Sequence, residues 1–449
     1  MVESAALPIH FIGEGRLGSA QLTPAQASWA SANGFTGQRG RLLPLPDEAG
    51  QLSGYAFGTG AEANRPAFVS GLVSAALPGG RYRLLGDVGD ATRAATAFLL
   101  GAYRFDRYRQ PAASPELELP EGADAAEVSR QVAAATLARD LINTPPNELG
   151  PDALDRAIRD FAAERGMEVS ATVGDDLLAQ NFPLIHAVGR ASAQAPRLLD
   201  LTWGNAEHPK VTLVGKGVTF DTGGLDIKTA AGMLLMKKDM GGAANVLGLA
   251  HAIVDAGLPV RLRVLIPIVE NAISGSSFRP GDIIRSRAGI TVEIGNTDAE
   301  GRLILADALA LADSEKPELL LDMATLTGAA RAALGPDLPP LYSTDDALAR
   351  DLVAAGLSWE DPLWPMPLWS PYESMLASKI ADINNAGSGG FAGSVTAALF
   401  LRKFVREAHQ WVHLDIYGWA PEARPGRPAG GTDQAIRAVY GVLQQRYGR

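Results

Sequence analysis

The sequence predicts an α/β protein of two domains, in which a small N-terminal α/β domain precedes a larger C-terminal domain with a mainly parallel sheet covered by helices on both faces. A chain of 449 residues is longer than one hydrophobic core usually organises, because domains commonly have about 100 to 200 residues. Strand-like apolar runs alternate with helical runs along most of the chain, which is typical of such sheets. A segment rich in proline and glycine interrupts this alternation. We therefore expect domains at residues 1–110 and 125–449, joined by a linker at 111–124.

The first domain combines short apolar runs with alanine-rich helical stretches. Residues 8–12 and 82–85 are strand-like, and residues 91–103 are rich in alanine with helical spacing. No cluster of acidic or basic residues stands out there. These features predict a small α/β unit.

The second domain begins with two helices whose limits are marked by proline. Residues 125–141 have helical periodicity and stop before Asn143-Thr-Pro-Pro-Asn147, since proline cannot continue a helix. A second helix, 151–165, starts with proline in its first turn. Six strands are expected after it, interleaved with helices at 243–256 and 303–312: residues 167–173, 198–202, 210–214, 260–268, 290–294 and 318–323.

Composition excludes several classes of function. With 47% hydrophobic and 20% charged residues the chain is globular, and its net charge of -10 argues against a nucleic-acid partner. It has no cysteine, so disulfides and thiolates are excluded and any metal must be held by oxygen and nitrogen donors. The first residues lack the basic start and apolar stretch of a signal peptide, and no run of about 18 apolar residues could cross a membrane. We expect a soluble cytoplasmic protein without a membrane partner.

The first motif with chemical content is Asn296-Thr-Asp-Ala-Glu-Gly-Arg-Leu303, which joins an expected strand to an expected helix. Ends of strands in open α/β sheets are where ligands bind. Asp298 and Glu300 lie two residues apart, so both carboxylates can point the same way from an extended loop and bind Mg²⁺, Mn²⁺ or Zn²⁺. Alternatively, these residues cap the helix and favour its N-terminus. The motif alone leaves both interpretations open.

Another apolar strand, 210–214, leads to a second polar cluster. Lys216 and Asp221 follow it, and Gly223-Gly224 comes next. The spacing of a phosphate-binding G-x-x-x-x-G-K-[ST] loop is absent. For Lys216 the alternative is a lysine that reaches the surface at the end of a strand.

A third acidic position, Asp239, lies between two methionines and before Gly-Gly-Ala-Ala. Such a carboxylate is either part of a closely packed site or the cap of the alanine-rich helix that follows. The adjacent Lys237 and Lys238 are expected to be solvated or paired with acids rather than catalytic.

Histidine and serine chemistry finds little support. Neither an H-E-x-x-H nor a G-x-S-x-G motif occurs. His413 lies in the alternating run 411–416, where a hydrogen-bonded structural histidine is expected. The six histidines are scattered through the chain: His10, His186, His208, His251, His409 and His413.

Taken together, the motifs resemble the leucyl aminopeptidase (cytosol aminopeptidase) family of dinuclear metallopeptidases. The run 296–303 is the most specific of them, and the resemblance covers roughly residues 125–416. The first domain matches only in general character. The other matching segments are 143–149, 214–217, 220–224, 236–244, 279–282, 324–329 and 380–382.

The resemblance implies a catalytic metallopeptidase domain that hydrolyses the N-terminal bond of peptides, with a preference for hydrophobic first residues. It implies two divalent ions, Zn²⁺ or Mn²⁺ with Mg²⁺ as the alternative, which together activate a water. Asp221 and Glu300 would bridge the ions, Lys216 and Asp239 would complete the tighter site, and Asp298 would complete the more exchangeable one. Lys216 can be a ligand only as the neutral amine.

Two positive residues carry further implied roles. Lys228 would stabilise the oxyanion of the tetrahedral intermediate, and Arg302 would hold a bicarbonate that acts as general base. The family is typically hexameric, so a homohexamer is expected by analogy.

The implied pocket for the first side chain contains one departure from the family pattern. Met236, Thr325 and Gly328 match it, but the chain has Tyr417 where a small residue is usual. Tyr417 would fill part of the pocket. Two other functions are considered: a dinuclear hydrolase for dipeptides such as cysteinylglycine, and a DNA-binding or scaffolding role suggested by the divergent first domain. The net charge and the complete ligand set oppose the second.

Overall fold

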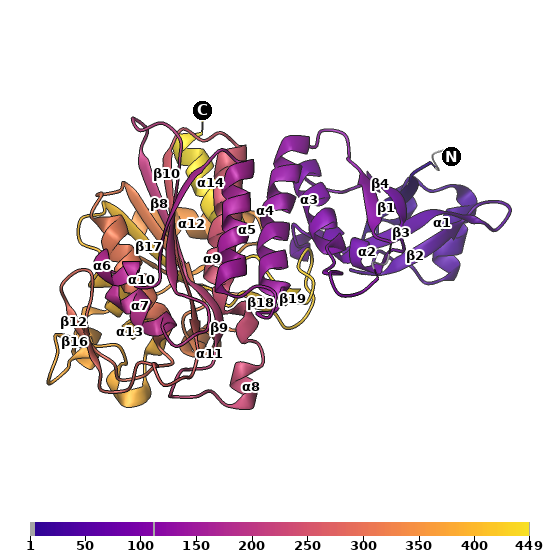
Figure 1. Ribbon diagram of the computed structural model, residues 1–449. Coiled ribbons are helices and arrows are strands. Elements are labelled where there is room, and N and C mark those ends of the chain that lie inside the picture. Colours follow the sequence, from indigo (N-terminus) through magenta and orange to yellow (C-terminus); the bar gives the residue numbers. More distant parts are fainter. Residues whose placement is uncertain (1–4, 111–112, 449) are drawn as a thin grey trace. The chain divides into compact units, whose positions relative to one another are not determined.

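The computed structural model describes residues 5–110 and 113–448, which form two compact units. The first unit contains the residues up to 136 together with 358–360 and 420–430, and the second contains the remainder. Both units combine strands and helices (Figure 1), so the predicted α/β class is confirmed. No described helix is both long and apolar enough to span a bilayer.

The first unit is built on a five-stranded sheet in the order β2-β3-β1-β4-β5. Alternate side chains of its central strand face opposite sides, with Ile9 and Phe11 in one core and Ile12 in another. Three helices contribute to these cores: α1 (Pro24–Ala32), α2 (Ser70–Ala76) and α3 (Ala91–Ala102). Four strands are parallel to their neighbours and β2 is antiparallel: β1 (Leu7–Gly13), β3 (Leu52–Gly60), β4 (Gly80–Gly86), β5 (Pro115–Glu118) and β2 (Leu42–Pro46).

The segment expected as a linker, 111–124, contributes to this sheet. Strand β5 lies within it and pairs with β4, while residues 111–112 lie outside the described residues. The two compact units divide at 136/137, inside α4 (Ala125–Asn143), rather than before it. Proline and glycine mark the turns around β5, but composition carries no information on the residues with which a short strand pairs.

The second unit contains a nine-stranded sheet whose central strands are parallel, with antiparallel pairing of β14 to β17 on one side and of β7 to β10 and β6 on the other. All but the first residue of β8 are buried, because helices cover both faces. Strand β9 pairs with β10 beyond the end of β8. The order is β15 (Trp364–Pro365), β14 (Pro340–Ser343), β17 (Gln410–Asp415), β13 (Leu319–Ala324), β8 (Lys210–Gly215), β10 (Arg261–Asn271), β7 (Arg197–Trp203) and β6 (Glu168–Val173), with β9 (Gly217–Asp221) beside β10.

Helices pack on both faces of this sheet, as expected (Figure 1). Proline begins α5 at its first position, and α4 ends before the two prolines that follow it. One face carries α5 (Pro151–Glu164) and α9 (Gly241–Asp255), with α14 (Ile436–Tyr447) against α9, and the other carries α7 (Pro183–Gly189) and α10 (Glu300–Asp313), with α13 (Gly393–Arg402) against α10.

One expected strand lies elsewhere. The run 290–294 forms β12 (Thr291–Glu293), but β12 belongs to a separate three-stranded sheet with β11 (Ile283–Arg285) and β16 (Ile383–Asn384). The segment before Asp298 is therefore not a strand of the main sheet. Its β-branched composition predicts a strand correctly, whereas its partners come from distant segments that local pattern cannot identify.

Candidate metal centre

Three separate segments bring lysines and carboxylates together at the carboxyl ends of β8 and β9. Lys216 follows β8 directly, Asp221 ends β9, and Glu300 is the first residue of α10. Asp239 lies in a short 3₁₀ helix, η3 (Met236–Met240). These residues line one cavity of about 560 Å³. The three polar clusters that the sequence shows apart thus form one site.

Lys216 lies at the centre of the more enclosed half. Its Nζ is 2.8 Å from Asp239 Oδ2 and 2.9 Å from Glu300 Oε1, and it donates a hydrogen bond to the Thr325 carbonyl at 3.0 Å. Only 2% of Lys216 is exposed, so the alternative of a surface lysine was wrong. A Cβ on Gly301 would lie 2.6 Å from Lys216 Cε, so any larger residue at the start of α10 would force the Lys216 side chain to shift from its present position.

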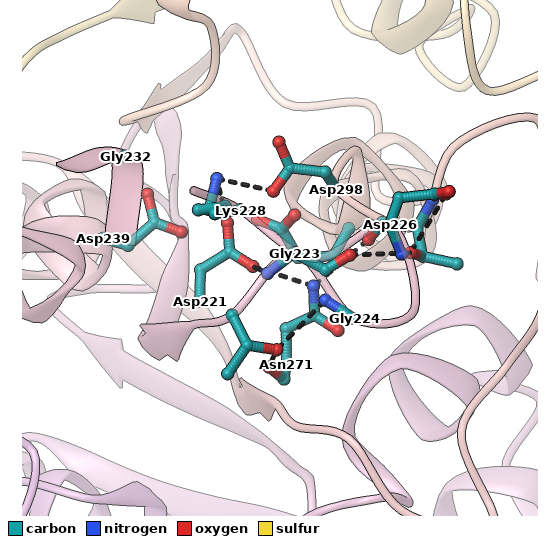
Figure 2. A network of polar contacts seen from close by, with 12 residues as sticks. Asp221, Gly223, Gly224, Asp226, Lys228, Gly232, Asp239, Asn271 and Asp298 are labelled. Carbon is teal, nitrogen blue, oxygen red and sulfur yellow. Dashed lines mark hydrogen bonds and ion pairs between the residues drawn. The ribbon is translucent and has the colours of Figure 1, made fainter. Parts of the chain in front are cut away.

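Lys228 holds the more open half. Its Nζ is 2.8 Å from Asp221 Oδ2 and 2.5 Å from Asp298 Oδ1. The Asp298 side chain is 33% exposed, against 3% for Asp221. Figure 2 shows Lys228 beside Asp298, with the carboxylates of Asp221 and Asp239 turned toward the same space.

Asp221 is held in place by groups that donate to its other oxygen. The backbone amide of Gly223 and the side-chain amide of Asn271 each donate to Asp221 Oδ1 at 2.8 Å. Gly223 has φ +87°, a conformation that favours glycine. With Oδ1 so occupied, Oδ2 is directed toward Lys228 and the cavity.

The acids of the site are crowded. One oxygen from each of Asp221, Asp298 and Glu300 can be chosen so that all three lie within 4.8 Å of one another. Burial, followed by the Asp221 carboxylate, raises the pKa of Glu300 to about 8. Burial and the Asp239 carboxylate also raise the pKa of Asp221. Burial opposes ionisation of Asp239 as well, but Lys216, Lys238 and Lys228 together outweigh it and lower the pKa of Asp239.

This donor set fits divalent metal ions. Glu300 Oε2 is buried without a hydrogen-bond partner among the described residues. An unpaired carboxylate oxygen at such a position is costly unless a cation meets it. The two lysines already show where positive charge is stabilised. Oxygen ligands with one neutral amine suit Zn²⁺ or Mn²⁺ and, with more water, Mg²⁺.

Arg302 lines the same cavity from the first turn of α10. Its Nη1 donates to the carbonyl of Asn385 at 2.6 Å, while its Nε is buried and finds no partner within the described chain. Burial lowers the pKa of Arg302 to about 10. A small anion beside Arg302 would satisfy the unpaired N–H.

Each residue expected to form the pocket for a first side chain also lines this cavity. Met236 begins η3, Thr325 follows β13, and Gly328 begins α11 (Gly328–Leu334). Tyr417 follows β17 by two residues and is half-buried. Thr325 also donates to Asp239 Oδ1 at 2.8 Å, so the pocket and the acid cluster share a wall.

The structure overturns the two capping interpretations. Helix α10 has Ala299 at its N-cap and α9 has Met240, and neither helix has a side-chain cap. Glu300 still favours the helix through the charge of its first turn. The acids at 239 and 298 instead face lysines.

The structure also shows polar residues whose role the sequence did not reveal. Lys238 was expected to be solvated or paired with an acid, yet it is only 5% exposed and has no carboxylate within 4.0 Å among the described residues. Arg331 of α11 lines the cavity near it. The sequence signal for Lys238 was its position next to Asp239. Arg331 and Asn271 gave no local signal.

The interpretation of His413 as a structural residue is confirmed. It is fully buried in β17, and its Nδ1 lies 2.5 Å from Asp322 Oδ1 of β13. His413 does not line the cavity.

Comparisons with known proteins point to one family. The model described as "Cytosol aminopeptidase family, catalytic domain" matches residues 136–440, and that described as "M17 aminopeptidase, N-terminal domain" matches residues 8–120. A probable cytosol aminopeptidase of Roseiflexus castenholzii is 42% identical over 365 residues, covering 77% of this chain and 74% of the relative.

Solved structures agree with these matches over the whole chain. The crystal structure of a cytosol aminopeptidase from Coxiella burnetii superposes with a TM-score of 0.93 at 45% identity, covering 100% of this chain and 98% of the other. The bottromycin maturation enzyme BotP in complex with Mn gives a TM-score of 0.89 at 33% identity, covering 99% of this chain and 100% of that enzyme.

Proposed function

The chain belongs to the cytosol aminopeptidase family of peptidases, and from this premise we propose that it removes the N-terminal residue of peptides with two divalent metal ions. Four carboxylates and one lysine would hold the ions: Asp221, Asp239, Asp298, Glu300 and Lys216.

One observation carries this proposal. Three carboxylates from two segments of the chain, Asp221 from one and Asp298 and Glu300 from the other, have oxygens within 4.8 Å of one another, and a buried oxygen of Glu300 is unpaired among the described residues, in a cavity large enough for a peptide end. Acids this close repel one another unless cations lie among them. The preference for hydrophobic first residues remains a prediction from the resemblance.

Bound divalent ions would supply Lewis acidity toward the scissile carbonyl and lower the pKa of the attacking water. The chain's own contribution is positional. Lys228 stays protonated because Asp221 and Asp298 outweigh burial and raise its pKa above the usual value. Its ammonium can therefore stabilise the negative charge that develops on a carbonyl oxygen.

Arg302 would hold the group that accepts the proton from water. No histidine lines the cavity, and the acids there are engaged with lysines. The Arg302 guanidinium would hold a bicarbonate, which would supply a base that the side chains lack.

The proposal also includes the identity of the metal ions, the oligomeric state and the cellular location. The manganese bound by BotP favours Mn²⁺ among the candidates, with Zn²⁺ next. For a homohexamer, light scattering should give a mass of about six times the chain mass of 47.1 kDa. Relatives named cytosol aminopeptidases support a cytoplasmic location.

Metal analysis paired with a substrate panel tests the function. Purified protein stripped with a chelator should lose hydrolysis of aminoacyl anilides and regain it with Mn²⁺ or Zn²⁺. Free-amine substrates should be cleaved and their N-acetylated counterparts should not, because an aminopeptidase requires a free α-amino group. Cleavage of acetylated substrates would favour a general dinuclear hydrolase instead.

A further inference from the structure

One wall of the cavity is positively charged because it contains Lys238 and Arg331, in contrast to the acid cluster described above. Tyr417 organises this wall: its ring centroid is 4.6 Å from Lys238 Nζ and 5.1 Å from Arg331 Cζ. All three side chains line the cavity that holds the acid cluster. Lys238 is buried, while Arg331 is exposed.

Neither cation is neutralised by the protein. Within the described parts of the chain, Lys238 and Arg331 have no carboxylate within 4.0 Å and no side-chain hydrogen bond. Contact with the face of an aromatic ring stabilises a cation but does not cancel its charge. A buried ammonium without a counter-ion is costly.

The acids nearest in sequence to Lys238 and Tyr417 are Asp239 and Asp415, and both have other hydrogen-bond or ion-pair partners. Asp239 meets Lys216 and the Thr325 hydroxyl. Asp415 accepts hydrogen bonds from the backbone amides of Leu326 and Thr327 and from the Thr327 hydroxyl. Asp239 and Asp415 therefore act on Lys238 only from beyond 4.0 Å, and a carboxylate that enters the cavity could contact this ammonium directly.

We infer that Lys238 and Arg331 bind a carboxylate of the peptide substrate, so that the enzyme favours acidic substrates over hydrophobic ones. This inference rests on the proposed function and replaces its hydrophobic preference. The carboxylate has two sources: the side chain of an N-terminal Glu or Asp, or the C-terminus of a dipeptide. Tyr417 positions both cations and narrows the space that a leucine side chain would need.

Paired substrates that differ by one charge separate the two sources. Glu- and Gln-p-nitroanilide have the same shape, as do Leu-Leu and its C-terminal amide. For whichever source is used, kcat/KM should be at least about tenfold higher for the charged member, as expected for a charge-assisted pair. Lys238→Met should reduce that ratio to near one, and Arg331→Gln should reduce it less because Arg331 is exposed.

Lys237→Met is the matched control. Lys237 donates to the carbonyl of Asn143 and lies over the Trp419 ring, so its loss removes one adjacent charge without touching the wall. Its charged-to-neutral ratio should equal that of the wild type. Calorimetric binding of L-glutamate against L-glutamine, and of Leu-Leu against its amide, gives a second readout that needs no turnover.

The outcomes are distinct. Cleavage of Leu- and Gln-anilides with both charge ratios near one would overturn the inference and leave the proposed function intact. Ratios that survive in Lys238→Met would also overturn it. Absence of cleavage of every aminoacyl substrate would refute the proposed function, while calorimetry would still report whether the wall selects a carboxylate.

Discussion

The two lysine-centred halves of the site differ in enclosure. Lys216, Asp239 and Glu300 have side chains that are 2 to 4% exposed. In the other half Lys228 is 16% and Asp298 33% exposed. Each half has one lysine between two carboxylates, so the difference lies in access to solvent rather than in chemistry.

If the proposed centre holds two ions, this difference predicts one tight and one more exchangeable metal position. In the proposed centre, an ion in the enclosed half would have to displace the proton of Lys216, whose pKa is raised because Asp239 and Glu300 outweigh burial. The residues of that half would shield the ion from water. An ion in the open half would be held in part by Asp298, which solvent can reach. Glu300 and Asp221 connect the halves, so their loss should affect both.

The largest effect is expected for Glu300→Gln. The Glu300 carboxylate is buried and close to those of Asp221 and Asp298. Removing its charge should abolish metal binding in both halves and lower kcat/KM by at least about a thousandfold. Metal content per chain, measured by mass spectrometry of the dialysed protein, should fall to near zero. Glu207→Gln, an exposed loop acid, is the control. Retained activity in Glu300→Gln would eliminate the proposed centre.

A smaller and separable loss is expected for Asp298→Asn. Only the open half should weaken, so about one ion per chain should remain after dialysis, and activity should fall about a hundredfold and recover partly at high Mn²⁺ concentration. Titration of activity against free metal gives the apparent affinity. Loss of both ions would show that the halves are not independent.

Lys228→Met tests whether the open lysine acts on the substrate rather than on the ions. The kcat should fall about a hundredfold, as for loss of one group that stabilises an oxyanion, while the metal content stays at the wild-type level. Stopped-assay kinetics and metal analysis on the same preparation measure both. A variant with normal kcat would assign Lys228 to charge balance alone.

The smallest effect concerns Asp307, a buried acid of α10 that has no lysine beside it. Its carboxylate accepts backbone hydrogen bonds from Leu184, Ile185 and Arg287, yet burial prevails and raises its pKa from 3.8 to about 7. The folded state then holds a proton that the unfolded chain has lost. Stability should therefore fall as the pH rises from about 4 to about 7, by at most about 1.4 kcal/mol per pH unit.

The variant Asp307→Asn isolates the contribution of this carboxyl group to the pH dependence of stability. We expect the Tm of the wild type, relative to that of the variant, to fall as the pH rises. The measurement uses metal-free protein from pH 5 to pH 7.5. A constant difference would mean that the backbone donors keep Asp307 ionised throughout.

Local pattern predicted most of this molecule. The limits of α4 and α5 follow from proline, and the buried strand β8 follows from its apolar run. The motif around Asp298 and Glu300 located the acids, although through the resemblance rather than through spacing. What local pattern could not supply is pairing between distant segments: β12 joins β16 some 90 residues later in the chain, and Asn271 reaches Asp221 across 50 residues.

Lys238 shows the same limit for side chains. In sequence it is one of two adjacent lysines, and solvation is the usual fate of both. The fold directs Lys237 to the carbonyl of Asn143 and buries Lys238 against Tyr417. The direction in which each side chain leaves a short 3₁₀ turn depends on what packs around that turn.

The glycine at position 301 also constrains how this enzyme can be redesigned. Because the Lys216 side chain occupies the volume that any residue larger than glycine would need, positions 301 and 216 behave as one unit of variation. A library that varies either position alone should return mostly inactive clones. Altering the metal preference of the enclosed half therefore calls for paired substitutions, a shorter ligand at 216 together with a larger residue at 301.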